Sequence, residues 1–139
     1  MNTGENQVWL RAGLVTCVLI HFIVLLWHGT AHILIPVPLT GLQTAFVGFV
    51  IFLLPLIGAG LLWTERGRTA AWLITLSMLG ALLFGFTNHF MRASPDYVLE
   101  VPANTWRHSF VTSAALLAVT ETVGTMVGAV AVWRWRRTA

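Results

Sequence analysis

The chain has 139 residues, of which 57% are hydrophobic and only 9% are charged. So few charged side chains cannot cover the surface of a water-soluble protein, and the composition therefore excludes a single soluble domain. Its eight basic and five acidic residues give a net charge of +3, which is too small for a protein that binds nucleic acid. The single cysteine, Cys17, excludes an internal disulfide and redox sites of the CxxC type.

Four apolar stretches follow one another along the chain, and each is long enough to cross a bilayer, which needs about 20 residues per helix. They cover residues 8–35, 41–63, 69–90 and 106–134. Pro36 and Pro38 end the first stretch, because proline lacks a backbone donor and restricts the residue before it. We therefore predict an all-α integral membrane protein in which residues 1–139 form one four-helix, up-and-down transmembrane bundle surrounded by lipid.

The distribution of arginine predicts the orientation of this bundle. Six arginines lie at the end that carries both chain termini, namely Arg11, Arg66, Arg68, Arg134, Arg136 and Arg137. Arg92 and Arg107 lie at the opposite end. Because the positive-inside rule places the arginine-rich end in the cytoplasm, we expect both termini there and the loop 91–105 on the outer side.

Polar side chains inside a bilayer are costly and therefore mark candidate functional sites. His21, His28 and His32 fall within a sector of about 40° on one helix, because successive residues are 100° apart. His89 ends the third predicted helix and His108 begins the fourth. An up-and-down topology brings these ends and the outer end of the first helix to one membrane face. We therefore expect His28, His32, His89 and His108 to converge there.

The spacing of His28 and His32, four residues apart on one helix, lets two imidazoles bind one metal ion. His89 and His108 would complete a set of nitrogen ligands that zinc, copper and iron all accept. The predicted function is to hold a transition-metal centre at the outer membrane face. Its chemistry would be metal-dependent, or redox chemistry as in an oxidoreductase, on a lipid-soluble or outer-compartment substrate.

Other ligands and other roles fit the same region. Asp96 or Glu100, from the outer loop, would supply an oxygen ligand or orient a histidine. Haem b held by His28 and His108 is an alternative cofactor, but its two axial ligands lie on opposite faces, so His32 would be left over. A bare ion is therefore preferred. As a further alternative, the histidines form hydrogen bonds to lipid headgroups and outer water without a metal.

Glu121 is a second polar residue within a predicted span, near the middle of stretch 106–134, and His21 has a similar depth in the first helix. The two side chains would meet as an ion pair or as a neutral hydrogen-bonded pair. Such a pair serves either as a clamp between helices or as a proton relay. A proton-coupled transporter that uses this relay is one alternative function.

Proline and glycine predict how the helices pack. Pro55 has no N–H to donate to the Ile51 carbonyl, so we expect a kink in the second helix. Gly124 and Gly128 form a GxxxG pattern, which permits close contact between helices. Because such faces also mediate assembly, a second alternative is a non-catalytic structural subunit of a larger membrane complex, or a homo-oligomer.

Overall fold

The computed structural model of the chain describes residues 3–135, apart from the side chains at positions 3, 4 and 6. All regular secondary structure within these residues is helical. In chain order the elements are α1 (Thr3–Leu34), α2 (Gly41–Phe46), the π-helix η1 (Val47–Leu53), α3 (Leu54–Leu61), α4 (Gly67–Phe86), the π-helix η2 (Thr87–Met91) and α5 (Arg107–Trp135). Four segments are long and apolar enough to span a membrane: Gln7–Leu34, Gly41–Leu61, Gly67–Met91 and Arg107–Trp135. This confirms the predicted helical class.

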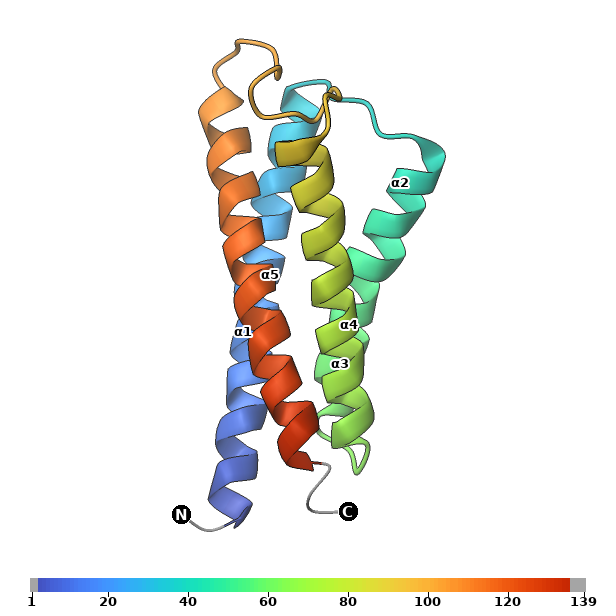
Figure 1. The fold of residues 1–139 in the computed structure, drawn as a ribbon, viewed down its shortest axis with the longest axis vertical. Coiled ribbons are helices and arrows are strands. Elements are labelled where there is room, and N and C mark those ends of the chain that lie inside the picture. Colours follow the sequence, from blue (N-terminus) through green and yellow to red (C-terminus); the bar gives the residue numbers. More distant parts are fainter. Residues whose placement is uncertain (1–2, 136–139) are drawn as a thin grey trace.

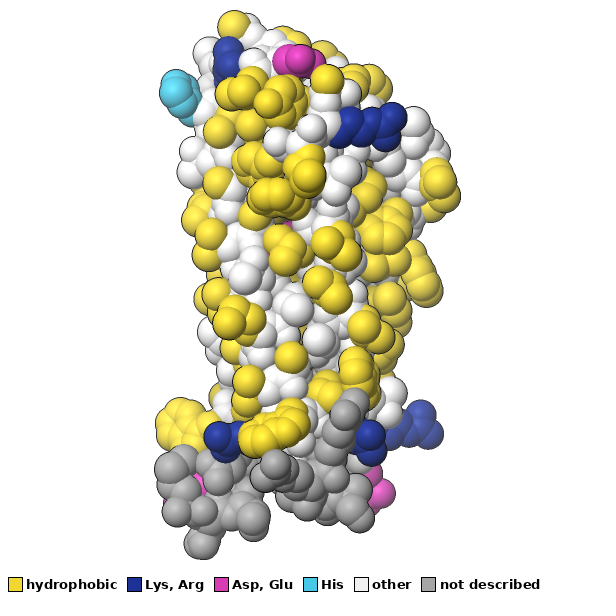
Figure 2. All heavy atoms as spheres, in the orientation of Figure 1, with side chains coloured by type: hydrophobic (Ala, Val, Ile, Leu, Met, Phe, Trp, Pro, Cys, Tyr) yellow, Lys and Arg dark blue, Asp and Glu magenta, His cyan; other side chains and the backbone are white. Residues whose placement is uncertain are grey.

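The four segments run alternately up and down, so both ends of the chain lie at one end of the bundle (Figure 1). The connection between η2 and α5 covers the opposite end, where α2 leans away from the other helices (Figure 1). Figure 2 shows apolar side chains along the length of one flank and arginines near its two ends. Arg136 and Arg137 lie outside the described residues. Which end faces the cytoplasm stays a prediction.

Pro55 determines the shape of the second span. Because it cannot donate a hydrogen bond to Ile51, the helix before it widens into the π-helix η1, and α3 carries the proline in its first turn. The Ile51 carbonyl instead accepts a hydrogen bond from Nε2 of His21, at 3.3 Å. The expected kink therefore takes the form of a wide helical turn in which the buried Ile51 carbonyl accepts a hydrogen bond from α1.

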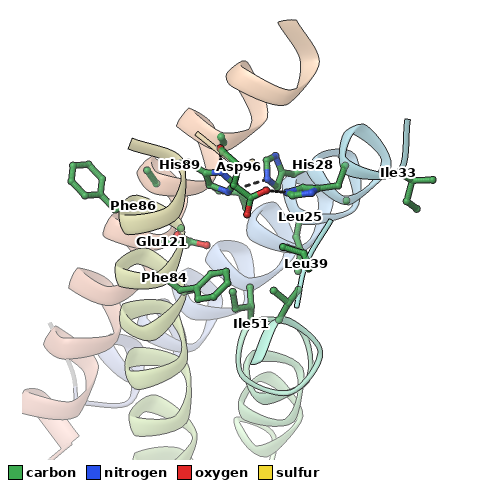
Figure 3. A pocket seen from close by; sticks show the side chains of 18 residues that line it. Leu25, His28, Ile33, Leu39, Ile51, Phe84, Phe86, His89, Asp96 and Glu121 are labelled. Carbon is green, nitrogen blue, oxygen red and sulfur yellow. Dashed lines mark hydrogen bonds and ion pairs between the residues drawn. The ribbon is translucent and has the colours of Figure 1, made fainter. Parts of the chain in front are cut away.

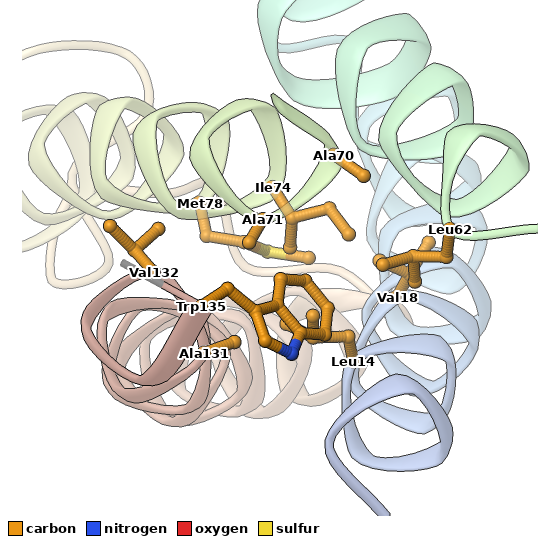
Figure 4. Close-up of a cluster of buried hydrophobic side chains, with 10 residues drawn as sticks. All are labelled: Leu14, Val18, Leu62, Ala70, Ala71, Ile74, Met78, Ala131, Val132 and Trp135. Atoms are coloured by element: carbon orange, nitrogen blue, oxygen red, sulfur yellow. The ribbon is translucent and has the colours of Figure 1, made fainter. Parts of the chain in front are cut away.

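Buried side chains form separate layers along the bundle. Near the chain termini, one layer consists of Leu14, Val18, Leu62, Ala70, Ala71, Ile74, Met78, Ala131, Val132 and Trp135 (Figure 4). At the other end a second layer, here called the apolar cap, consists of Ala31, Ile35, Val37, Val98, Val101, Phe110 and Ala114. The cap includes residues of the loop 91–105. That loop therefore packs onto the helices instead of extending into water.

Close contact between α4 and α5 depends on the glycines of the GxxxG pattern. A Cβ atom at Gly124 would lie 3.2 Å from Met78 Cγ, and one at Gly128 would collide with the side chain of Thr75. Both positions are buried. The pattern that suggested helix contact from the sequence therefore marks the α4–α5 interface within this chain.

Replacing Gly128 with leucine is expected to lower the thermal stability, because overpacking a tight contact costs about 1–3 kcal/mol. The matched control is Gly60→Leu, since a Cβ at Gly60 meets no heavy atom of the described residues within 4 Å. Thermal unfolding of both variants in one detergent is the measurement. Equal midpoints would show that close packing at Gly128 does not stabilise the bundle.

Candidate metal centre

Three histidines lie together at the loop end of the bundle. His28 and His32 project from α1, and His89 projects from η2, a π-helical turn of the kind often found at functional sites. One ring nitrogen of each histidine lies within 4.8 Å of those of the other two. His28 is 5% exposed and His89 is 6% exposed. The structure thus brings together three of the four histidines that were expected to converge.

The partner of His28 determines which of its ring nitrogens carries hydrogen. The hydroxyl of Ser113 donates its single hydrogen to the Ser109 carbonyl, 2.6 Å away. That hydroxyl must therefore accept a hydrogen bond from Nδ1 of His28, at 2.9 Å. In the neutral imidazole, Nε2 of His28 is consequently left with an unprotonated lone pair.

His89 is oriented in the same way. Its Nδ1 lies 3.0 Å from the backbone carbonyl oxygen of Asp96, which can only accept, so Nδ1 is the donor. The Nε2 atoms of His28 and His89 are only 3.2 Å apart. Two neutral imidazoles would therefore point lone pairs at each other, an arrangement that repels unless a proton or a metal ion lies between them. Two nitrogens bound at about 2.1 Å to one tetrahedral ion are ~3.4 Å apart, close to this spacing.

His32 is held beside a buried carboxyl group. Its Nε2 lies 3.6 Å from Oδ1 of Asp96. Asp96 is 4% exposed, and burial raises the pKa of its carboxyl group to about 6. The other ring nitrogen of His32, Nδ1, is buried without a hydrogen-bond partner among the described residues. An unsatisfied buried nitrogen is costly, so this ring has capacity to bind a ligand.

Hydrogen bonds connect the loop 91–105 to the helix that carries His89. The hydroxyl of Ser94 donates to the Asn88 carbonyl at 3.1 Å and accepts from the Asp96 N–H at 3.3 Å. The N–H of Val98 donates to the His89 carbonyl at 3.0 Å. These bonds hold both the Asp96 carbonyl and the Asp96 carboxyl group over the histidines.

Comparison of the chain with protein-family models, with curated proteins and with solved structures finds no match. The proposed function therefore rests on the geometry of the site. Hydrogen bonds orient two of its imidazoles, and a carboxyl group lies beside the third.

Two residues that the sequence pattern suggested for the site lie elsewhere. His108 and Glu100 are exposed, and neither joins the cluster found among the described residues. His108 points away because Phe110, two residues and about 200° further round α5, faces the histidines. This corrects the predicted set of four histidines to three. It also means that His28 and His108 are not paired as axial haem ligands.

Two residues that the sequence pattern does not single out contribute to the site. Phe110 is fully buried, and its ring centroid lies 4.9 Å from those of both His28 and His32. Ser113 lies on the same side of α5, one turn further on, and binds His28. The sequence pattern that could have identified them is a serine within an apolar span, three residues after a phenylalanine. Residues i and i+3 lie on the same face of a helix, so Phe110 and Ser113 would face the same neighbour.

His21 and Glu121 lie next to each other deeper in the bundle. His21 Nδ1 is 3.8 Å from Glu121 Oε1, and their side chains are 1% and 4% exposed. Because Nε2 of His21 donates to the Ile51 carbonyl, Nδ1 is the nitrogen left to face the carboxyl group. At this distance the two atoms form no hydrogen bond, and Nδ1 of His21 has no hydrogen-bond partner among the described residues, so the contact between the two side chains is electrostatic.

A cavity of about 240 Å³ extends from the histidine cluster to Glu121. Its polar lining residues are His28, His32, His89, Asp96 and Glu121, and its other lining residues are aliphatic, aromatic or glycine. Figure 3 shows His28, His89 and Asp96 close together, with Glu121 between this group and Phe84. The polar groups of both sites therefore face one largely apolar space.

A double-mutant cycle tests the pairing of His21 and Glu121. We expect Glu121→Leu to destabilise the protein by about 1–3 kcal/mol, because it removes the carboxyl group that lies beside the buried Nδ1 of His21. Glu121→Gln should cost less, since the amide keeps a polar group next to the imidazole. The double variant His21→Leu/Glu121→Leu should be more stable than the sum of the single effects predicts, by about 0.5–3 kcal/mol. Additive changes in thermal stability would show that the two side chains do not interact.

Proposed function

We propose that this chain is a multi-pass membrane protein that binds one transition-metal ion through His28, His32 and His89. The observation that carries the proposal is the 3.2 Å separation of the Nε2 atoms of His28 and His89. From the partners of the two Nδ1 atoms we infer that both Nε2 atoms present lone pairs. Their Nδ1 atoms donate to a serine hydroxyl and a backbone carbonyl. Metal-binding histidines usually donate their second ring nitrogen in this way, which fixes the tautomer and the ring orientation.

The donor set favours zinc, copper or iron, because imidazole suits all three ions. When bound, such an ion would activate a water molecule or a substrate oxygen at its remaining open position, and copper or iron would also transfer electrons. The function we propose is therefore metal-dependent or redox chemistry at the loop end of the bundle. Haem is disfavoured, since the three histidines are too closely grouped to bind opposite faces of one porphyrin.

Residues around the histidines would support this role. The carboxyl group of Asp96 would orient His32, in the manner of the carboxylate–histidine pairs around zinc. Ser113 holds His28, and the Asp96 carbonyl holds His89. The apolar cap lies over the site and would keep bulk water from the ligands, which strengthens electrostatic interactions inside.

Elemental analysis of the detergent-purified protein, combined with its optical absorption spectrum, tests the proposal. Protein prepared without chelator is expected to contain one zinc, copper or iron per chain and to lack the intense absorption of haem. A metal-free protein would contradict the proposal and would favour a non-catalytic subunit of a larger membrane complex. A haem spectrum would contradict the ligand assignment.

We further propose that the site lies at the non-cytoplasmic end of the bundle, because most arginines lie at the opposite end, which carries the chain termini. A cysteine placed at Ser94 should then react with an impermeant reagent added outside intact cells. Labelling only after the cells are opened would reverse this orientation.

Replacing Asp96 with asparagine is expected to weaken metal binding by about 10- to 100-fold, the usual effect of losing a residue that orients a ligand. The amide keeps the size of the side chain but removes its charge. Glu100→Gln is the matched control, because Glu100 is an exposed acid in the same loop. Competition with a metal-sensitive dye measures both affinities. Equal losses in the two variants would indicate a general effect of charge and not a contact with His32.

A further inference from the structure

We infer that the histidine site takes an apolar molecule dissolved in the bilayer, one that carries a single hydroxyl group and enters from the lipid-facing side of the helices. This inference rests on the proposed metal function, since the hydroxyl oxygen would occupy the open position on the ion. It adds the class of ligand and the route by which the ligand arrives.

The aqueous end of the site is closed by apolar side chains. In the apolar cap, Ile35 and Phe110 are fully buried and Val101 is 2% exposed. Phe110 contacts the histidines directly, and Val98 and Val101 belong to the loop that covers them. A charged solute arriving from water would have to displace this layer and lose its hydration, so the cap disfavours that route.

The sides of the cavity reach the surface that faces lipid. Ile33 and Phe86 line the cavity and are 80% and 48% exposed. Ile33 belongs to the membrane-spanning segment Gln7–Leu34, and Phe86 belongs to Gly67–Met91. Leu39 also lines the cavity, just before α2, which leans away from the bundle at this end (Figures 1 and 3). The accessible rim is therefore apolar and lies within the membrane.

The size and the polar groups of the cavity define the ligand. Its volume of about 240 Å³ is larger than the ~150 Å³ cavity that holds benzene in an engineered protein, so an aromatic ring fits, and a longer alkyl substituent would extend past the exposed Ile33 and Phe86 into lipid. Asp96 and Glu121 provide carboxyl oxygens that accept a hydrogen bond from a hydroxyl group. Three histidine nitrogens and one hydroxyl oxygen would complete a four-coordinate ion. An alkylphenol combines these properties.

Cobalt provides the spectroscopic readout, because its visible absorption changes when a ligand enters its coordination sphere. The full-length protein in lipid nanodiscs is loaded with Co²⁺ and titrated with para-nonylphenol, which partitions into the bilayer. We expect a saturable change of the cobalt spectrum. The water-soluble anion para-hydroxybenzenesulfonate, which offers the same hydroxyl group, is expected to cause no change.

A substitution at Gly29 tests the route. Gly29 lines the cavity, and a Cβ there meets no heavy atom of the described residues within 4 Å. Gly29→Phe should therefore place a ring against the cavity, one helical turn before the exposed Ile33, without a collision at its Cβ. We expect this variant to keep the cobalt spectrum and to raise the half-saturating para-nonylphenol concentration by at least about 10-fold. Gly60→Phe is the matched control, since Gly60 also has open space at Cβ and does not line this cavity.

The outcomes separate the two proposals. A wild-type protein that binds no cobalt overturns the metal site and the ligand inference together. Cobalt binding without a response to para-nonylphenol overturns the ligand inference alone. An equal response to the sulfonate would show that the site opens to water, and equal titrations of Gly29→Phe and Gly60→Phe would show that the ligand does not pass Gly29. A Gly29→Phe variant without a cobalt spectrum is replaced by Gly29→Leu, and the same comparison applies.

Discussion

Replacing His89 with alanine is expected to abolish stoichiometric metal binding, and replacing His28 should have the same effect. The two Nε2 atoms are 3.2 Å apart, so each variant removes half of the closest donor pair. Losing a residue that only orients a ligand costs about 10- to 100-fold in affinity, so losing a ligand itself should cost more than ~100-fold. Metal content per chain after dialysis against a weak competing chelator measures this effect.

Two control variants separate loss of a ligand from loss of a histidine. His108→Ala should retain the metal, because His108 is exposed and lies outside the cluster. His21→Ala should retain it as well, since His21 lies about 16 Å from His32 along the helix axis, beyond one coordination sphere. Undiminished metal in the double variant His28→Ala/His89→Ala would overturn the ligand assignment. Thermal unfolding of each variant shows whether the bundle remains folded.

Most of this site was predictable from helix geometry. The angular positions of His28 and His32 place them on one face of α1, and the up-and-down order of the helices brings His89 to the same end. Neither step needs knowledge of packing between helices. Both steps need only the helix boundaries, which follow from the apolar pattern, and the rotation of 100° per residue. The structure places all three side chains in one cluster.

The error at His108 has a physical cause that the sequence contained. His108 and Glu121 are about 220° apart around α5, so one helix face cannot present both to the interior. Glu121 lies nearer the middle of the span, where exposing a carboxyl group to lipid costs most, and it therefore faces His21 inside the bundle. The contacts of Gly124 and Gly128 with α4 fix the same rotation of α5. His108, near the end of the helix, can face outward at little cost.

The tautomers of the histidines were not predictable from the sequence. They depend on a backbone carbonyl at Asp96 and on a hydroxyl at Ser113, whose positions follow from the fold of the loop and the rotation of α5. No local pattern fixes either contact. The widening of the helix at η2, which carries His89, is likewise a feature that simple helical periodicity cannot give.

Replacing Phe110 with alanine is expected to destabilise the protein by about 3–5 kcal/mol, the usual cost of truncating a large aromatic residue in a core. Phe110 is fully buried, and its ring centroid lies 4.9 Å from His28, 4.9 Å from His32 and 5.5 Å from His89. It is the common neighbour of all three imidazoles. Its loss should therefore weaken metal binding as well as lower the unfolding temperature, because the rings gain freedom to rotate.

The matched control is Phe49→Ala, which removes the same atoms from a side chain that is 58% exposed. Exposed positions usually change stability by less than about 0.5 kcal/mol, so the two unfolding temperatures should differ clearly. Phe110→Leu keeps much of the buried volume and should be intermediate, which preserves the test if Phe110→Ala does not fold. Equal stabilities of Phe110→Ala and Phe49→Ala would show that the apolar cap does not support the cluster. A stable Phe110→Leu protein with reduced metal affinity would show that the aromatic ring itself orients the histidines.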